Sequence, residues 1–338
     1  MNHEISEKIP VISFVMMCEV ILYHCESPDI GLAVSTADLW FNQLITNIVA
    51  GPVSMLCMCW FFTISGFLLF RNLSFQNLGR KLKSRCGSLL VPYILWNALY
   101  ILKSILQGNM WTLSKMFTQT FLLRLWPPLG AFWYIYTVFL LALLSPIFLI
   151  LFKTEKIGWF SSIALILMLY IFWSHLCIGN GNAHYTGNIK AFFPSYVIGA
   201  FFGHIYDDST IQKKIKYAVS FLLVAVLLDD NISFLLHKMA ISVLPILMLL
   251  LLPVPEWCKR RNVYRLTFLM YATHQSIISL SIGKIRDFIH AIVPYVSIVN
   301  IMGRILCLFL IIAVNAGIHA VLRRFVPKAL KLLTGGRC

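Results

Sequence analysis

Charged residues are scarce in this sequence, and acidic residues are the scarcest. Only 12% of the 338 residues are Asp, Glu, Lys or Arg, whereas 59% are hydrophobic. A soluble globular domain carries about twice that share of charge, so the composition excludes one. The alternation of apolar and polar residues that marks an outer-membrane β-barrel is also missing. The chain is therefore predicted to be all-α, a polytopic integral membrane helical bundle.

Linkers, repeats and metal-site patterns are missing too. No Gly- and Ser-rich linker or internal repeat divides the chain, so residues 1–338 are predicted to form a single membrane-embedded domain. Cys57 and Cys59 lack the two-residue gap typical of a zinc site, and no metal is expected. Cys25 and Cys177 both fall on the predicted outer side, and the sequence leaves open whether they form a disulfide.

Apolar stretches of about 17 to 25 residues, long enough to cross hydrocarbon as helices, recur along the chain. Ten helices are predicted, at residues 9–25, 51–70, 88–107, 131–152, 158–175, 191–206, 216–229, 236–253, 264–283 and 293–322. No A-x-A-like cleavage site follows the first of them, so we expect it to remain as the first helix.

Basic residues explain the topology better than they explain a nucleic-acid partner. The 28 Lys and Arg residues outnumber the 13 acidic ones, which gives a net charge of +15. Most of them fall in alternate loops, such as 71–85, 259–265 and 323–337, and the opposite loops hold few. By the positive-inside rule both termini are predicted to be cytoplasmic. The lipid bilayer is thus the expected partner, and no nucleic acid is expected.

Four ionisable residues fall within predicted spans: Glu19, His24, His274 and Arg304. Charges at this depth are costly, by about 2.5 to 3.5 kcal/mol on insertion scales, so each is a functional candidate. Glu19 and Arg304 are predicted at similar depths. They form either a structural ion pair between the first and last helices or a pair that shapes a site beside His24.

His24 is predicted near the outer boundary of the hydrocarbon. It is either an interfacial histidine that reaches toward headgroups or a general base for a hydroxyl, because the pKa of imidazole lies near neutrality. His274 is predicted near mid-membrane. It is either a packed histidine bonded to a neighbour or a residue that orients a donor or His24.

Several segments carry a resemblance to a known family. They read FFTISGFLLF at 61–70, RKLKSRCGSLLVPY at 80–93, FWYIYTVFLLALLSPIF at 132–148, FFPSYVIGAFFG at 192–203 and YATHQSII at 271–278. In this order they resemble the membrane-bound acyltransferase 3 family, whose members move acyl groups, commonly acetyl, onto sugars of envelope polysaccharides and related acceptors.

The resemblance implies an integral-membrane O-acyltransferase of the bacterial cytoplasmic membrane. Its donor would be cytosolic acyl-CoA, with acetyl-CoA expected, and its acceptor a hydroxyl of an envelope polysaccharide or lipid-linked glycan. His24 would be the general base, and Glu19 would belong to the catalytic group. The family usually carries an Arg eleven residues before this histidine, where this chain has Ser13. Lys8 and Arg304 are the candidate substitutes.

The basic segment after the second helix is the expected donor site. Either charge-assisted hydrogen bonds from its side chains hold the phosphates of coenzyme A, or its charge is the positive-inside excess that faces anionic headgroups. With Ser65 of the SGFLL segment, the residues assigned to this site are Arg80, Lys81, Lys83 and Arg85.

The acceptor side is assigned to Trp133, Tyr136, His274 and Arg304. The two aromatic residues are either part of an aromatic belt or a stacking surface for a sugar. The polar segment 177–190 is either a solvated connection between helices or a segment that helps to select the acceptor.

A second class of function also stays open. The protein could be a transporter or flippase for a glycan lipid, with Glu19, Arg304 and His274 lining a polar path through the bundle. The internal pseudo-symmetry usual in secondary transporters is not seen in the sequence.

Overall fold

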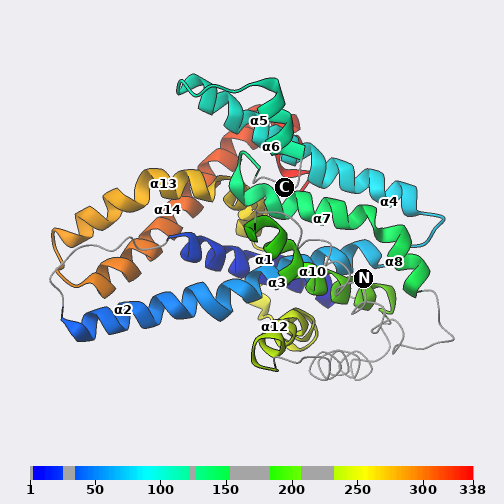
Figure 1. Cartoon of the computed structure of the whole chain (residues 1–338), viewed down its shortest axis with the longest axis horizontal. Coiled ribbons are helices and arrows are strands. Elements are labelled where there is room, and N and C mark those ends of the chain that lie inside the picture. The colour runs from blue at the N-terminus through cyan, green and yellow to red at the C-terminus, as the bar shows by residue number, and fades with distance from the viewer. Residues whose placement is uncertain (1–2, 26–34, 122–126, 153–182, 207–231, 338) are drawn as a thin grey trace. The chain divides into compact units, whose positions relative to one another are not determined.

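The computed structural model describes residues 3–25, 35–121, 127–152, 183–206 and 232–337. All regular elements in these ranges are helices, which confirms the all-α prediction (Figure 1). The α-helices are α1 (His3–His24), α2 (Thr36–Ile48), α3 (Ser54–Phe70), α4 (Leu78–Arg85), α5 (Val91–Leu106), α6 (Leu113–Phe121), α7 (Trp133–Leu143), α8 (Ser145–Phe152), α10 (Ala183–His204), α12 (Ile232–Leu251), α13 (Thr267–His290), α14 (Val296–Phe325) and α15 (Pro327–Thr334). Short π- or 3-10 segments are η1 (Val49–Val53), η2 (Cys86–Leu90), η3 (Gly130–Phe132), η5 (Glu256–Cys258) and η6 (Asn262–Leu266).

Three continuous helical stretches among the described residues are long and apolar enough to cross a membrane: Thr36–Phe70, Leu78–Leu106 and Val296–Phe325. A bent pair, Gly130–Leu143 with Ser145–Phe152, brings the number to four if it forms one span. The predicted spans 158–175 and 216–229 lie outside the described residues. Ten spans and cytoplasmic termini therefore stay predictions.

The described chain divides into two compact units. Unit 1 comprises Met58–Pro253 with the terminal pieces Met1–Ile5 and Leu332–Gly336. Unit 2 comprises Ser6–Cys57 and Val254–Lys331 with Arg337–Cys338.

The predicted span at 131–152 is interrupted in unit 1. Helices α7 and α8 meet at an angle of 52° around Leu144. Pro146 lies at the second position of α8, where its missing N–H cannot continue the hydrogen-bond ladder of α7. Pro146 therefore explains the break between α7 and α8, which apolar length alone did not predict.

Helix α3 and helix α10 approach each other very closely in unit 1. A Cβ added to Gly199 would lie 2.0 Å from the Thr63 carbonyl oxygen, and one added to Gly66 would lie 2.2 Å from the Tyr196 carbonyl oxygen. Gly203 makes the same kind of approach, at 2.5 Å from the Phe67 carbonyl oxygen. Small residues let membrane helices bring their backbones together, so these glycines fix the α3–α10 contact.

Helix α2 of unit 2 was not expected, because residues 36–48 were assigned to a loop before the second span. Asp38, Asn42 and Thr46 follow one another at intervals of four and form a polar stripe on this helix. All three bond to α14: the Asp38 carboxylate accepts from the Val296 and Ser297 amides at 2.8 and 3.2 Å, and Asn42 and Thr46 accept from Asn300. The polar stripe thus faces protein, where its hydrogen bonds are satisfied.

Large apolar side chains of α2 are exposed, namely Leu39, Trp40, Phe41, Leu44 and Ile48, beside the exposed polar residues Gln43 and Asn47. The polar stripe Asp38, Asn42 and Thr46 instead contacts α14, which reverses the usual arrangement of a soluble amphipathic helix for these residues. A search for a buried apolar stripe, the usual sign of an amphipathic helix, therefore does not identify this segment as a helix.

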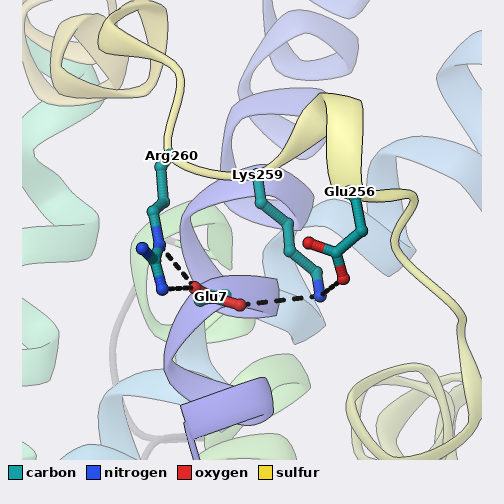
Figure 2. A network of polar contacts seen from close by, with 4 residues as sticks. All are labelled: Glu7, Glu256, Lys259 and Arg260. Carbon is teal, nitrogen blue, oxygen red and sulfur yellow. Dashed lines mark hydrogen bonds and ion pairs between the residues drawn. The ribbon is translucent and has the colours of Figure 1, made fainter.

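The start of α1 is held by charges from the connection before α13, also in unit 2. Figure 2 shows the Glu7 carboxylate between two cations, with Arg260 Nη2 at 2.5 Å and Lys259 Nζ at 3.5 Å. Lys259 also pairs with Glu256 at 2.6 Å, and this hydrogen bond, with the charge of Glu7, raises the pKa of Lys259. Arg260 has a positive φ of 55°, uncommon outside glycine. The bend it makes brings two neighbouring cations to one carboxylate.

Candidate functional site

The structure brings the two candidate histidines of unit 2 together. His24 is the last residue of α1, and His274 lies two turns into α13. Their ring centroids are 5.1 Å apart, and the Tyr23 ring also lies near His24, with centroids 5.0 Å apart. His24 is half-buried, whereas His274 is only 1% exposed. The sequence identified each histidine but did not reveal their contact.

The hydrogen bonding of His274 fixes its tautomer. Its Nδ1 lies 2.7 Å from the Tyr271 carbonyl oxygen. A carbonyl oxygen only accepts, so Nδ1 carries the proton and Nε2 keeps a lone pair in the neutral ring. Among the residues that the structure describes, none hydrogen-bonds to this buried Nε2. A second imidazole with an available acceptor atom thus lies beside His24.

Arg304 and Glu19 interact electrostatically, and Arg304 also donates hydrogen bonds to its own helix and to α1. Its Nε donates to Asn300 Oδ1 at 2.9 Å, and its Nη1 donates to the Leu22 carbonyl. Glu19 is half-buried and lies within range of the Arg304 charge. The guanidinium therefore contacts the turn of α1 that carries His24, and Glu19 offsets part of its charge.

Two residues beside this turn were missed by the sequence reasoning. Arg286 Nη2 donates to the Cys25 carbonyl at 2.8 Å and to Asn300 Oδ1 at 3.3 Å. Arg286 lies beyond the predicted span 264–283, because the apolar pattern fades after residue 283, whereas α13 continues to His290. Asn300 precedes Arg304 by one helical turn, and that spacing was the available signal.

The position of the family arginine is occupied by Ser13, which lies within α1. Of the two candidate substitutes, Arg304 contacts the turn that carries His24, whereas Lys8 lies near the start of α1 and is 3% exposed.

Cys25 is a free, buried thiol that interacts with Cys307. Cys177, the other member of the disulfide left open above, lies outside the described residues, as do 177–182 of the polar segment.

The basic cluster of unit 1 divides into two faces of α4. Arg80 and Lys83 are exposed. Lys81 instead donates to the Arg71 carbonyl at 3.0 Å, and Arg85 donates to the Ser65 carbonyl at 3.3 Å. The first pair is therefore the more open to a soluble ligand, since Lys81 and Arg85 are half-buried and turn toward the end of α3.

Ser65 and Arg85, assigned together from sequence, do lie together. The Ser65 hydroxyl bonds to the Tyr134 hydroxyl at 2.9 Å, which in turn donates to the Phe61 carbonyl at 3.0 Å. Arg85 also interacts electrostatically with Tyr134 and Tyr196. These contacts make a polar cluster around the small Ser65–Gly66 step of α3.

The aromatic candidates on α7 have separate surroundings within unit 1. Trp133 packs near Phe62 and Phe192, with ring centroids 6.0 and 6.2 Å away. The Tyr136 hydroxyl donates to the Phe121 carbonyl at 2.8 Å, and its ring stacks on Tyr93 at 4.9 Å. One face of Tyr136 is therefore already covered by protein.

The apolar helices indicate a membrane protein, in which two neighbouring imidazoles lie on helices that also carry buried arginines or contact them. A family model described as an acyltransferase domain, that of the acyltransferase 3 family, matches residues 12–320. The chain belongs to this family, which confirms the resemblance and supports a membrane acyltransferase. Comparison with curated proteins found no match, and comparison with solved structures found none either.

Proposed function

We propose that the protein is an integral-membrane O-acyltransferase of the bacterial cytoplasmic membrane. It moves an acyl group, acetyl by expectation, from cytosolic acyl-CoA to a hydroxyl of an envelope polysaccharide or lipid-linked glycan. Family membership supports the transferase over the transporter or flippase. The observation that carries the residue assignment is the His24–His274 pair, with ring centroids 5.1 Å apart.

The proposed reaction needs one base. An imidazole nitrogen of His24 takes the proton of the acceptor hydroxyl as that oxygen attacks the thioester carbonyl carbon. The new C–O bond forms, the tetrahedral oxyanion collapses, and the C–S bond breaks. Coenzyme A leaves as a thiolate and receives the proton from the imidazolium. The products are an ester and the free thiol, so no oxidant or metal enters the balance.

Replacing His24 with alanine is expected to lower transfer of labelled acetyl from acetyl-CoA to endogenous glycan by roughly 100-fold or more, because general base catalysis is worth that much. Transfer is measured in membranes that hold wild type and variant at equal levels. His290→Ala, at the far end of α13, is the control and should transfer normally. Label that persists in the His24 variant would falsify the assigned base.

The exposed pair Arg80 and Lys83 is proposed to bind the phosphates of the donor. Charge-assisted hydrogen bonds of this kind account for about tenfold in affinity, so Arg80→Gln with Lys83→Gln should raise the apparent KM for acetyl-CoA by roughly tenfold. The matched control is Lys328→Gln with Lys331→Gln, two exposed cations at the same spacing on α15. Equal KM values for the two double variants would show that Arg80 and Lys83 do not bind the donor and serve only to set the membrane topology.

A further inference from the structure

The end of α1 is bound by two buried arginines from different helices. Arg304 of α14 donates to the Leu22 carbonyl, and Arg286 of α13 donates to the Cys25 carbonyl at 2.8 Å. These two carbonyls lie on either side of His24 in the chain. Both arginines are 4% exposed, so neither contact is an incidental surface interaction.

Asn300 joins the two arginines. Its Oδ1 accepts from Arg304 Nε at 2.9 Å and from Arg286 Nη2 at 3.3 Å. Its Nδ2 donates to Asn42 of α2 at 2.7 Å, and its side chain is fully buried. One amide thus fixes the directions of both guanidinium groups and ties them to a third helix.

Electrostatics explains why two like charges collect here. The last turn of a helix presents carbonyl groups without partners in the helix and the negative end of its dipole, and cations stabilise both. Arg286 and Arg304 are close enough to interact with each other, and Glu19 lies within range of Arg304. The α1 terminus and Glu19 together offset the repulsion between the two guanidinium groups.

We propose that Arg286, Asn300 and Arg304 form a clamp that positions His24 for proton transfer. This inference rests on the proposed function and adds a role for Arg286 and Asn300. The clamp holds the backbone on both sides of one residue, and that residue carries the proposed base. Arg286 and Asn300 are positioning residues, since they act on the reaction through the backbone of α1.

The test compares Arg286→Gln and Arg286→Lys with Lys284→Gln, which removes an exposed cation two residues away on the same helix. A displacement of about 1 Å can cost on the order of 100-fold in rate. We expect Arg286→Gln to lower the maximal acetyl transfer rate at least roughly tenfold, with the apparent KM for acetyl-CoA unchanged. Arg286→Lys, which keeps the charge and one donor, should recover part of the loss, and Lys284→Gln should match wild type.

Rates are divided by the amount of folded protein, measured by size-exclusion chromatography in detergent. A wild-type maximal rate in folded Arg286→Lys and Arg286→Gln would overturn the clamp, as would a loss that only follows the amount of folded protein. If Arg286→Gln does not fold, full activity of Arg286→Lys alone overturns it. His24→Ala is run in parallel: normal transfer there removes the proposed base and the clamp with it. Loss in His24→Ala with no loss in the Arg286 variants removes the clamp only.

Discussion

Replacing Gly199 with alanine is expected to lower the thermal stability of the purified protein steeply, although the change adds one methyl group. The added Cβ would lie 2.0 Å from the Thr63 carbonyl oxygen and 2.7 Å from its carbon. These are backbone atoms of a helix, so they cannot rotate away as a side chain does. Relief requires α3 and α10 to separate along their contact, which also loosens the approaches at Gly66 and Gly203.

Overpacking of this kind costs about 1 to 3 kcal/mol, and a rigid backbone contact favours the upper end. The melting temperature in detergent should fall by several degrees, measured by fluorescence or by loss of the monodisperse chromatographic peak. Gly283→Ala is the matched control, because its Cβ would meet nothing within 4 Å. There the same substitution should be neutral or slightly stabilising through helix propensity. Equal melting temperatures for the two variants would show that α3 and α10 do not pack as described.

Apolar length predicted the described helices well where a long apolar run carries only a few polar residues. The last predicted span, 293–322, is α14 (Val296–Phe325), and the first, 9–25, is α1 with an earlier start at His3. Helix α2 was missed because its polar stripe reads as a loop until Asn300 and Ser297 of α14 are known to bond to it. Its partners are more than 250 residues away in the chain, a distance that local periodicity cannot bridge.

The charge pattern identified the candidate residues, but it did not show which way their side chains point. Arg80, Lys81, Lys83 and Arg85 read as one cluster, yet their spacing on α4 sends Arg80 and Lys83 outward and the other two toward α3. The sequence pairs Glu19 with Arg304, and the two charges do interact, but it does not show that Arg304 also donates to Asn300 and to the Leu22 carbonyl. Unpaired backbone carbonyls at a helix end compete for arginine, and sequence does not show them.

His274→Gln is expected to lower acetyl transfer by roughly 100-fold, close to the effect of His24→Gln. Glutamine keeps a side chain that can bond to the Tyr271 carbonyl but has no atom that takes up a proton. The ring centroids of His274 and His24 are 5.1 Å apart, and Nε2 of His274 keeps a lone pair, so we expect the two imidazoles to act together in proton transfer. Groups that act as a unit give strongly non-additive effects, so the double variant should be no slower than the slower single variant.

The double-mutant cycle separates this cooperation from independent damage. Each variant is assayed in membranes at equal levels of folded protein, with His290→Gln of the same helix as the control that should transfer at the wild-type rate. Multiplied losses in the double variant would mean that His274 supports the fold or the acceptor independently of His24. A normal rate for His274→Gln alone would restore the simpler interpretation of His274 as a packed histidine bonded to the Tyr271 carbonyl, and would leave His24 to act by itself.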